Sequence, residues 1–167
     1  MSDAHTETTE RRVGIVVGSR SDIGAAERAM AVLDELEVDS EIRVISAHRA
    51  PELLTRFIAG AEARGICVFI AIAGLAAHLP GVVASQTTLP VIGVPMAGGV
   101  SDGLDALLAI VQMPKGVPVA TVAIGPSGAA NAGLLAIAIL AISRPELRAR
   151  LVAYREALAV EVKRQSL

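Results

Sequence analysis

The stretch VGIVVGSRSDIGAAERAMAVLDEL, residues 13–36, contains the unit from which the fold is built. Its first five residues are a short β-branched run, which is too brief for a helix and typical of a strand buried on both faces. Residues 21–36 then repeat apolar side chains at helical spacing: Ile23, Ala26, Met30 and Leu33. The stretch therefore predicts a strand, a tight turn and an amphipathic helix.

The same alternation continues along the chain. Further strands are predicted over 41–45, 66–73, 90–95 and 117–124. Helices are predicted from Pro51, over 78–87, from Ser101 as N-cap with Asp102 in the first turn, and over 129–141. Strands that alternate with helices in this way predict an α/β fold, a parallel sheet with helices on both faces. In such folds ligands bind beyond the carboxyl ends of the strands, where the strand order reverses.

The chain shows no linker or repeat that would divide this unit. We expect one catalytic domain over 13–142, preceded by a flexible polar tail over 1–12 in which His5 is solvated. A C-terminal amphipathic helix is expected over 143–167, with Ser143 and Glu146 as a capping box. Its apolar stripe (Leu147, Leu151, Tyr154 and Leu158) could pack on its own subunit or on a neighbouring one.

The composition predicts association. Hydrophobic residues make up 53% of the 167 residues and the mean hydropathy is +0.57, yet only 2% are aromatic. The core must therefore be built from Ala, Val, Ile and Leu. Because monomers rarely leave large apolar patches exposed, so much apolar surface on a modest domain predicts a homo-oligomer.

Charge and cysteine usage exclude several classes of protein. A formal net charge of −2 and a pI near 5.9 give no basic footprint for nucleic acid. The single cysteine, Cys67, excludes an internal disulfide and a Cys-based zinc site, and is expected to be a buried strand thiol in a reducing compartment. The start of the chain lacks the apolar segment of a secretory signal. The long uncharged stretches are interrupted by Gly and Pro, so we expect a cytoplasmic protein without a membrane span.

Polar residues follow the first predicted strand in the pentapeptide GSRSD, residues 18–22. Gly18 permits a tight turn, Ser19 and Ser21 offer hydroxyl groups, and the helix that follows exposes N–H groups that attract an anion such as phosphate. The pentapeptide matches neither the dinucleotide-binding nor the P-loop signature. Taken alone, it is better explained as an ordinary helix cap, because Ser and Asp cap helices well.

The second predicted strand ends in VISAHRAP, residues 44–51. Arg49 can hold a phosphate through two parallel hydrogen bonds, and His48 can carry a proton near neutral pH. Each residue alone could be a helix cap or an ordinary surface cation. Together with Ser46, at the carboxyl end of one strand, they favour a binding and proton-transfer site.

The later strand ends carry weaker signals. AGLAAHLPG, residues 73–81, places His78 among small residues, where Gly74 and Ala76 leave room for a ligand to approach the backbone. A lone histidine in an apolar run is more often a structural residue than a catalyst. Residues 96–103, MAGGVSDG, are glycine-rich and flexible enough to cover a small ligand, and residues 125–131, GPSGAAN, are expected to be a loop that enters a helix.

The residues required for several other kinds of site are missing from the sequence. A serine hydrolase would need G-x-S-x-G, and paired carboxylates of the glycosidase kind are missing from the strand ends. His48 and His78 are the only plausible metal ligands, and neither has an acidic partner nearby in sequence, so no metal site is expected.

The motifs together resemble a known family. GSRSD, SAHRAP, AAHLPG, LPVIGVP, GLDALLAIVQMPKGVPVATVAIG and AANAGLLA are similar to the N5-carboxyaminoimidazole ribonucleotide mutases of purine biosynthesis, over residues 13–140. The resemblance implies a flavodoxin-like three-layer α/β/α sandwich and a homo-octamer. It also implies a cofactor-free reaction on a small ribonucleotide and CO2, without metal, ATP or biotin.

The resemblance also implies roles for single residues. Ser19 and Asp22 would hold the ribose phosphate portion of the nucleotide, Arg49 would bind its phosphate, and Ser46 would line the same pocket. His48 would be the general acid and base, and His78 would shape the site around the imidazole and carboxylate. The released CO2 would be held in a small, dry hollow lined by glycine and alanine.

Two departures from the family pattern leave alternatives open. Leu75 stands where the family has a second glycine, and since a leucine favours negative φ, the loop path or pocket volume is expected to differ. Gly98 and Ser101 stand where serine and leucine are expected. The alternatives are a carboxylase that uses free CO2, a paralogue acting on a related ribonucleotide, and a catalytically silent nucleotide-binding oligomer.

Overall fold

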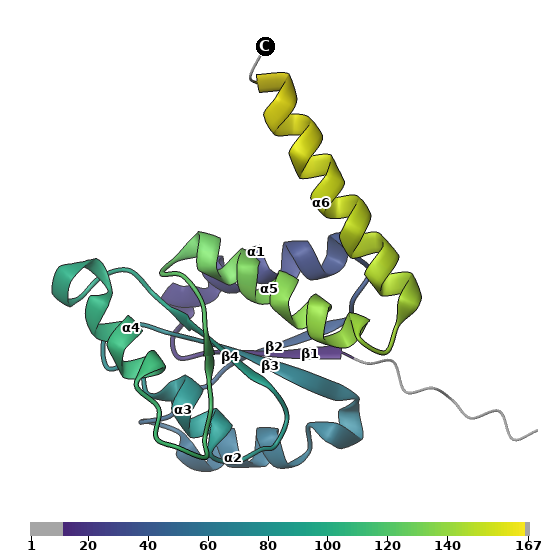
Figure 1. Ribbon diagram of the computed structural model, residues 1–167. Coiled ribbons are helices and arrows are strands. Elements are labelled where there is room, and N and C mark those ends of the chain that lie inside the picture. Colours follow the sequence, from purple (N-terminus) through teal and green to yellow (C-terminus); the bar gives the residue numbers. More distant parts are fainter. Residues whose placement is uncertain (1–11, 166–167) are drawn as a thin grey trace, which may run out of the picture.

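A computed structural model describes residues 12–165 of the chain (Figure 1). The predicted tail over 1–12, including His5, lies outside the described residues except for Arg12, which opens the first strand.

Within the described residues, five parallel strands form one sheet in the order β2-β1-β3-β4-β5. The strands are β1 (Arg12–Val17), β2 (Ser40–Val44), β3 (Ile66–Ala73), β4 (Val91–Pro95) and β5 (Ala120–Thr121). In the register of the sheet, Ile15 of β1 stands beside Ile42 of β2 on one side and Ile70 of β3 on the other. The predicted parallel sheet is confirmed, and the sequence-based limits of the first four strands differ by at most one residue.

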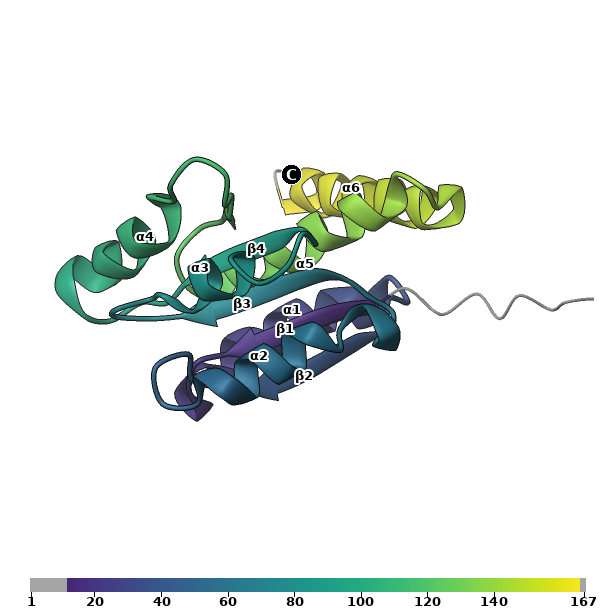
Figure 2. The same cartoon turned by 90° about the horizontal axis from the view of Figure 1, so that it is seen from below.

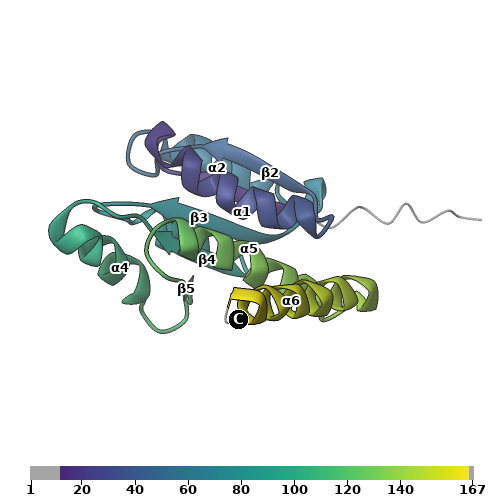
Figure 3. The same ribbon diagram turned by 90° about the horizontal axis from the view of Figure 1, so that it is seen from above.

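Helices cover both faces of the sheet (Figures 2 and 3). One face carries α1 (Ile23–Glu35) and α5 (Pro126–Ala141), and the other carries α2 (Pro51–Ala59), α3 (Leu79–Ala84) and α4 (Leu104–Val111). Short 3-10 turns lie between them: η1 (Arg20–Asp22), η2 (Glu62–Arg64) and η3 (Val100–Asp102). The layers and strand order are those of a flavodoxin-like α/β/α sandwich, as the sequence predicted.

Successive side chains of β3 point to opposite faces of the sheet, so this strand contributes to the hydrophobic core on each face. Val68, Ile70 and Ile72 are fully buried against the α1 and α5 layer, whereas Phe69 and Ala71 face α2, α3 and α4. Cys67, expected to be buried, is only partly buried, because it lies near the start of this strand.

Small residues allow the layers to approach closely. A side chain at Gly14 would place its Cβ 2.9 Å from Cε1 of Phe69, so the glycine makes room for the largest side chain of the core. A Cβ at Gly133 of α5 would lie 2.9 Å from the carbonyl oxygen of Ala29 on α1. The alanine-rich composition is therefore matched by close helix contact, because such side chains fill little volume.

Two predicted boundaries after β4 are wrong. β5 spans two residues rather than 117–124, because it pairs with β4 only at Ala120 and Thr121 and Pro118 has no N–H for a ladder. α5 begins at Pro126 and not at residue 129, so most of the expected loop over 125–131 is helical. Proline suits this first turn because its missing N–H has no helical partner there.

Ser101 is not the N-cap that the sequence predicted. It lies within η3 at φ 48° and ψ 44°, and α4 begins at Leu104 after Gly103. Two carboxylates hold this turn instead. The Gly98 N–H donates to Oδ1 of Asp102 at 3.2 Å, and the Val100 N–H donates to Oδ2 of Asp105 at 3.2 Å.

The C-terminal helix α6 (Pro145–Gln165) packs only its first turns on the domain. Leu147 and Leu151 are buried, Tyr154 is partly buried, and Leu158 is 51% exposed where the helix projects from the body (Figure 1). Its first helical bond runs from the Arg148 N–H to the Arg144 carbonyl, so Arg144 occupies the N-cap position predicted for Ser143. No helix in the described part of the chain combines the length and apolar character needed to cross a bilayer.

Candidate active site

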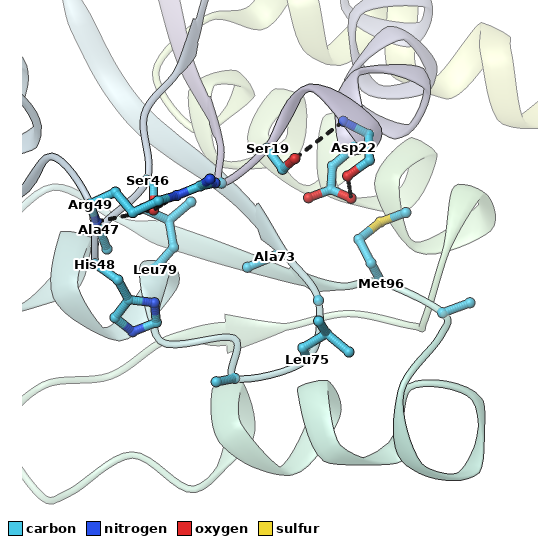
Figure 4. Close-up of a pocket in the computed structure, with 15 residues that line it drawn as sticks. Ser19, Asp22, Ser46, Ala47, His48, Arg49, Ala73, Leu75, Leu79 and Met96 are labelled. Atoms are coloured by element: carbon cyan, nitrogen blue, oxygen red, sulfur yellow. Dashed lines mark hydrogen bonds between the residues drawn. The ribbon is translucent and has the colours of Figure 1, made fainter.

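The strand order reverses between β1 and β3, because the chain leaves β1 for β2 on one side and returns to β3 on the other. A cavity of about 780 Å³ lies at the carboxyl ends of the strands around this point (Figure 4). Its lining comes from four strand ends: Gly18, Ser19, Ser21 and Asp22; Ser46, Ala47, His48 and Arg49; Ala73, Gly74, Leu75, Ala76 and Leu79; Met96 and Ala97. The volume is in the range of small-molecule sites.

The segment after β1 presents two hydroxyls and a carboxylate. The Gly18 N–H donates to the Ile72 carbonyl at 3.2 Å, which keeps the chain beside β3 as it leaves the sheet. Ser19 is the N-cap of η1, and its Oγ accepts from the Ser21 N–H at 3.4 Å. The Ser21 hydroxyl in turn donates to Oδ1 of Asp22 at 3.2 Å. Partial burial raises the pKa of Asp22, and the hydrogen bond from Ser21 opposes that shift.

The turn after β2 orients Arg49. The Ala50 N–H donates to the Ser46 carbonyl at 2.9 Å and closes the turn. Ser46 Oγ accepts from both the backbone N–H and Nε of Arg49, each at 3.3 Å. This holds the guanidinium by its inner nitrogen and directs it toward the side of the cavity where Ser19 lies (Figure 4). The terminal nitrogens can then bind an anionic group, a geometry that suits phosphate.

His48 is paired with His78. Nε2 of His48 lies 2.9 Å from Nδ1 of His78, and the two rings meet edge to face at 86°. His48 lines the cavity, whereas His78 stands behind it at the N-terminus of α3. One nitrogen must donate and the other accept, so the bond requires that at least one of the two rings is neutral. The arrangement holds the His48 ring in place and couples the tautomer of one ring to that of the other.

The turn after β3 departs from the expectation for Leu75. This leucine has φ 55°, so the backbone keeps the left-handed conformation that glycine adopts freely, at a cost of about 1 kcal/mol. The side chain of Leu75 is part of the cavity wall. Gly74 beside it is under close constraint, because a Cβ there would lie 3.3 Å from Cβ of Met96.

The segment after β4 contributes less than the sequence suggested. Met96 and Ala97 line the cavity, whereas residues 98–103 lie beyond the lining and are held by Asp102 and Asp105. Residues 125–131 do not line it either.

Of the nine residues predicted for the site, eight line the cavity and His78 lies next to it through His48. Sequence reasoning missed several apolar lining residues: Ala47, Ala73, Leu79, Met96 and Ala97. They lie within the stretches quoted above for the strand ends, but their apolar side chains gave no signal that singled them out from core residues.

The cavity is not the dry hollow that was expected. His48, Leu75, Ala76 and Ala97 are all exposed, so one side of it is open to solvent in the single chain. Its walls differ in character. Serines, Asp22, His48 and Arg49 come from β1 and β2, while the β3 and β4 side is built from small and apolar residues (Figure 4). Among the described residues, no group of three or more His, Cys, Asp or Glu is placed to hold a metal ion.

Known proteins share this sequence and fold. A sequence model described as AIR carboxylase matches residues 12–161. The chain is 57% identical over 148 residues to the N5-carboxyaminoimidazole ribonucleotide mutase of Mycobacterium tuberculosis, covering 89% of this chain and 84% of that one. It is 56% identical over 145 residues to the protein of the same name from Pyrococcus abyssi, covering 87% and 82%. The crystal structure of Treponema denticola PurE matches with a TM-score of 0.83 at 29% identity, covering 92% of this chain and 95% of that one.

Proposed function

The chain belongs to the AIR carboxylase family, and on this premise we propose that it is an N5-carboxyaminoimidazole ribonucleotide mutase of purine biosynthesis. The enzyme moves the carboxyl group of its substrate from the exocyclic nitrogen to carbon 4 of the imidazole ring. The observation that carries the assignment of this cavity is that its lining includes both an oriented arginine and a histidine that is hydrogen-bonded to a second histidine outside the lining.

Binding of the ribonucleotide follows from the polar wall. The guanidinium of Arg49, held by Ser46, faces the Ser19 side of the cavity, so the phosphate binds between these two groups. Asp22, on the same segment as Ser19, accepts a hydrogen bond from a ribose hydroxyl. Gly74 and Ala76 leave space for the base end of the substrate at the opposite wall.

His48 transfers a proton in each of two steps: it gives one in the first and takes another in the second. It donates a proton to the carbamate nitrogen as the C–N bond breaks, and the electron pair of that bond stays on nitrogen while CO2 departs. Carbon 4 of the aminoimidazole then attacks CO2, and neutral His48 removes the proton from that carbon. The histidine ends in the protonation state in which it began, so the reaction needs no net acid or base.

His78 acts as a positioning residue. It lies outside the cavity lining, and its Nδ1 is within hydrogen-bond distance of Nε2 of His48. The bond fixes the orientation of the His48 ring, in the way that second partners orient working histidines at other sites.

Retention of CO2 requires that the open side of the cavity be covered. We place this cover in a homo-octamer, in which a neighbouring subunit also packs on the C-terminal helix α6, outside the proposed catalytic domain over 13–142. The support is exposed apolar surface on α4 and α6 and at the turn between α5 and α6: Leu104, Leu108, Val111, Ile142, Val160 and Val162. The proposed location is the cytoplasm, where a free thiol such as Cys67 stays reduced.

The test supplies purified protein with N5-carboxyaminoimidazole ribonucleotide, or with aminoimidazole ribonucleotide and bicarbonate, at equal nucleotide concentration. The proposal predicts fast formation of the 4-carboxylated product from the first substrate and slow formation from the second. Equal rates from both would reassign the protein as a carboxylase that uses free CO2. Nucleotide binding without product from either substrate would indicate a silent binding protein.

A further inference from the structure

Leu75 combines three unusual properties. It has a left-handed backbone at φ 55°, its side chain is 63% exposed, and it lines the cavity. A bulky residue rarely adopts this conformation, and residues that do so cluster at sites where the strain serves a function. An exposed leucine in a substrate cavity also gains from being covered by an apolar partner.

The neighbouring loop is built around this side chain. A Cβ at Gly99 would lie 2.8 Å from Cδ2 of Leu75, and φ at Gly99 is 68°. The leucine therefore packs on bare backbone of the loop after β4. That loop is itself held by Asp105, which accepts from the Val100 N–H at 3.2 Å. Leu75 thus connects the β3 and β4 ends at the mouth of the cavity.

The contrast between the two walls determines which end of a ribonucleotide reaches Leu75. Figure 4 shows Leu75 and Met96 on one side of the cavity and Ser46, His48 and Arg49 on the other. Arg49, the one Arg or Lys side chain of the lining, lies on the other side, and the charged group beside Met96 is the carboxylate of Asp22, which does not attract a phosphate. The phosphate is therefore placed beside Arg49, and the planar base lies between His48, which acts on it, and Leu75.

We propose that the Leu75 side chain packs against the face of the aminoimidazole ring and determines affinity for the base end of the substrate. The inference rests on the proposed function, because it takes the ribonucleotide as the ligand. Covering about half of a leucine side chain corresponds to roughly a tenfold gain in affinity. The left-handed backbone keeps the side chain in the mouth of the cavity, where it meets the ring.

The experiment compares wild-type protein with Leu75→Ala and Leu75→Gly. The dissociation constants of aminoimidazole ribonucleotide and of ribose 5-phosphate are measured by calorimetry, and kcat and KM with the carbamate substrate. Both variants should bind aminoimidazole ribonucleotide about tenfold more weakly and bind ribose 5-phosphate as the wild type does. KM should rise by a similar factor, with a smaller change in kcat.

Leu53→Ala is the matched control, because Leu53 is an exposed leucine of α2 that does not line the cavity, and it should leave all constants unchanged. Wild-type affinity for aminoimidazole ribonucleotide in Leu75→Ala would overturn the inference. Equal weakening of both ligands would also overturn it, by showing that the loop and not the ring contact had changed. Absence of turnover in the wild type would instead overturn the proposed function, and the ring contact with it.

Discussion

Asp22 is a residue at which stability and substrate binding oppose one another. Its carboxylate is partly buried at the start of α1, makes no side-chain capping bond to the helix, and accepts from the Ser21 hydroxyl at 3.2 Å. Burial raises its pKa because the charged form loses water, and the bond from Ser21 offsets part of this. The charged form of Asp22 therefore destabilises the folded protein. In the proposed function, the same charge serves to bind the ribose of the substrate.

Asp22→Asn should raise the melting temperature at neutral pH and weaken binding of the ribonucleotide by about 10-fold or more. Asparagine keeps an oxygen for Ser21 but has no charge to desolvate. A raised carboxyl pKa adds stability below the ordinary value of 3.8, and this is lost as pH rises through the folded value. The gain from asparagine should thus be absent at low pH and appear as pH rises.

Thermal unfolding of both proteins from about pH 3 to about pH 7 checks this sign. A lower melting temperature for the variant at neutral pH would contradict the prediction. It would show that attraction between the Asp22 charge and the positive N-terminus of α1 exceeds the cost of burying that charge.

The His48–His78 bond leads to a second prediction at this scale. His78→Ala should lower kcat by about 10- to 100-fold with little change in KM, the range seen when groups that orient metal-bound histidines are removed. His78→Asn should retain more activity, because its side-chain amide can stand where Nδ1 does. Steady-state kinetics of the wild type, His78→Ala and His78→Asn across pH distinguishes a positioning role from a purely structural one. Equal rates for both variants would argue against a positioning role.

Single residues differed in how well the sequence could predict them. Ser46, His48 and Arg49 were predictable because they occur together at the end of an apolar strand, whereas Ser19 and Asp22 were assigned to the site through the family resemblance, since alone they also fit a helix cap. Met96 and Leu79 were not, since an apolar side chain that lines a cavity has the same sequence pattern as one in the core. For Leu75 the expected negative φ was wrong, because the backbone there is left-handed at φ 55°, a conformation that local preference disfavours.

Among the strands, the three buried ones and the partly exposed edge strand β2 were predictable within one residue, whereas β5 was not. β1, β3 and β4 are buried on both faces apart from partly buried residues at the start of β1 and β3, and each has a continuous apolar run in the sequence. β5 lies at the edge and pairs with β4 over two residues, although the stretch predicted as a strand, residues 117–124, is as apolar as the buried strands. Hydrophobic pattern alone does not reveal how many partners a strand has, so its length was overestimated.

The loop between β4 and α4 shows the limit of local signals. Ser101 followed by Asp102 is a typical helix start, yet the helix begins at Leu104. The carboxylates of Asp102 and Asp105 bind N–H groups of the preceding loop. Which backbone group a carboxylate binds depends on where the loop lies in three dimensions, and the sequence does not specify this.

For the whole molecule, alternating strands and helices predicted a parallel sheet but not its strand order. The order β2-β1-β3-β4-β5 makes β1 and β3 neighbours, and residues 18–22 and 74–76 therefore face one cavity although about 50 positions separate them. Three strand ends then supply the proposed anion site, the proposed proton carrier and an apolar wall. The proposed chemistry depends on this convergence.

Replacement of His48 by asparagine tests most directly whether the strand ends form one active site with His48 as its proton carrier. Purified wild-type and His48→Asn proteins are compared for turnover of N5-carboxyaminoimidazole ribonucleotide, for binding of ribose 5-phosphate and for thermal unfolding. We expect turnover to fall by about 1,000-fold or more, with phosphate binding and melting temperature unchanged. Turnover within a few-fold of wild type, in a variant that still binds ribose 5-phosphate, would contradict the assignment of His48 as the group that moves the proton.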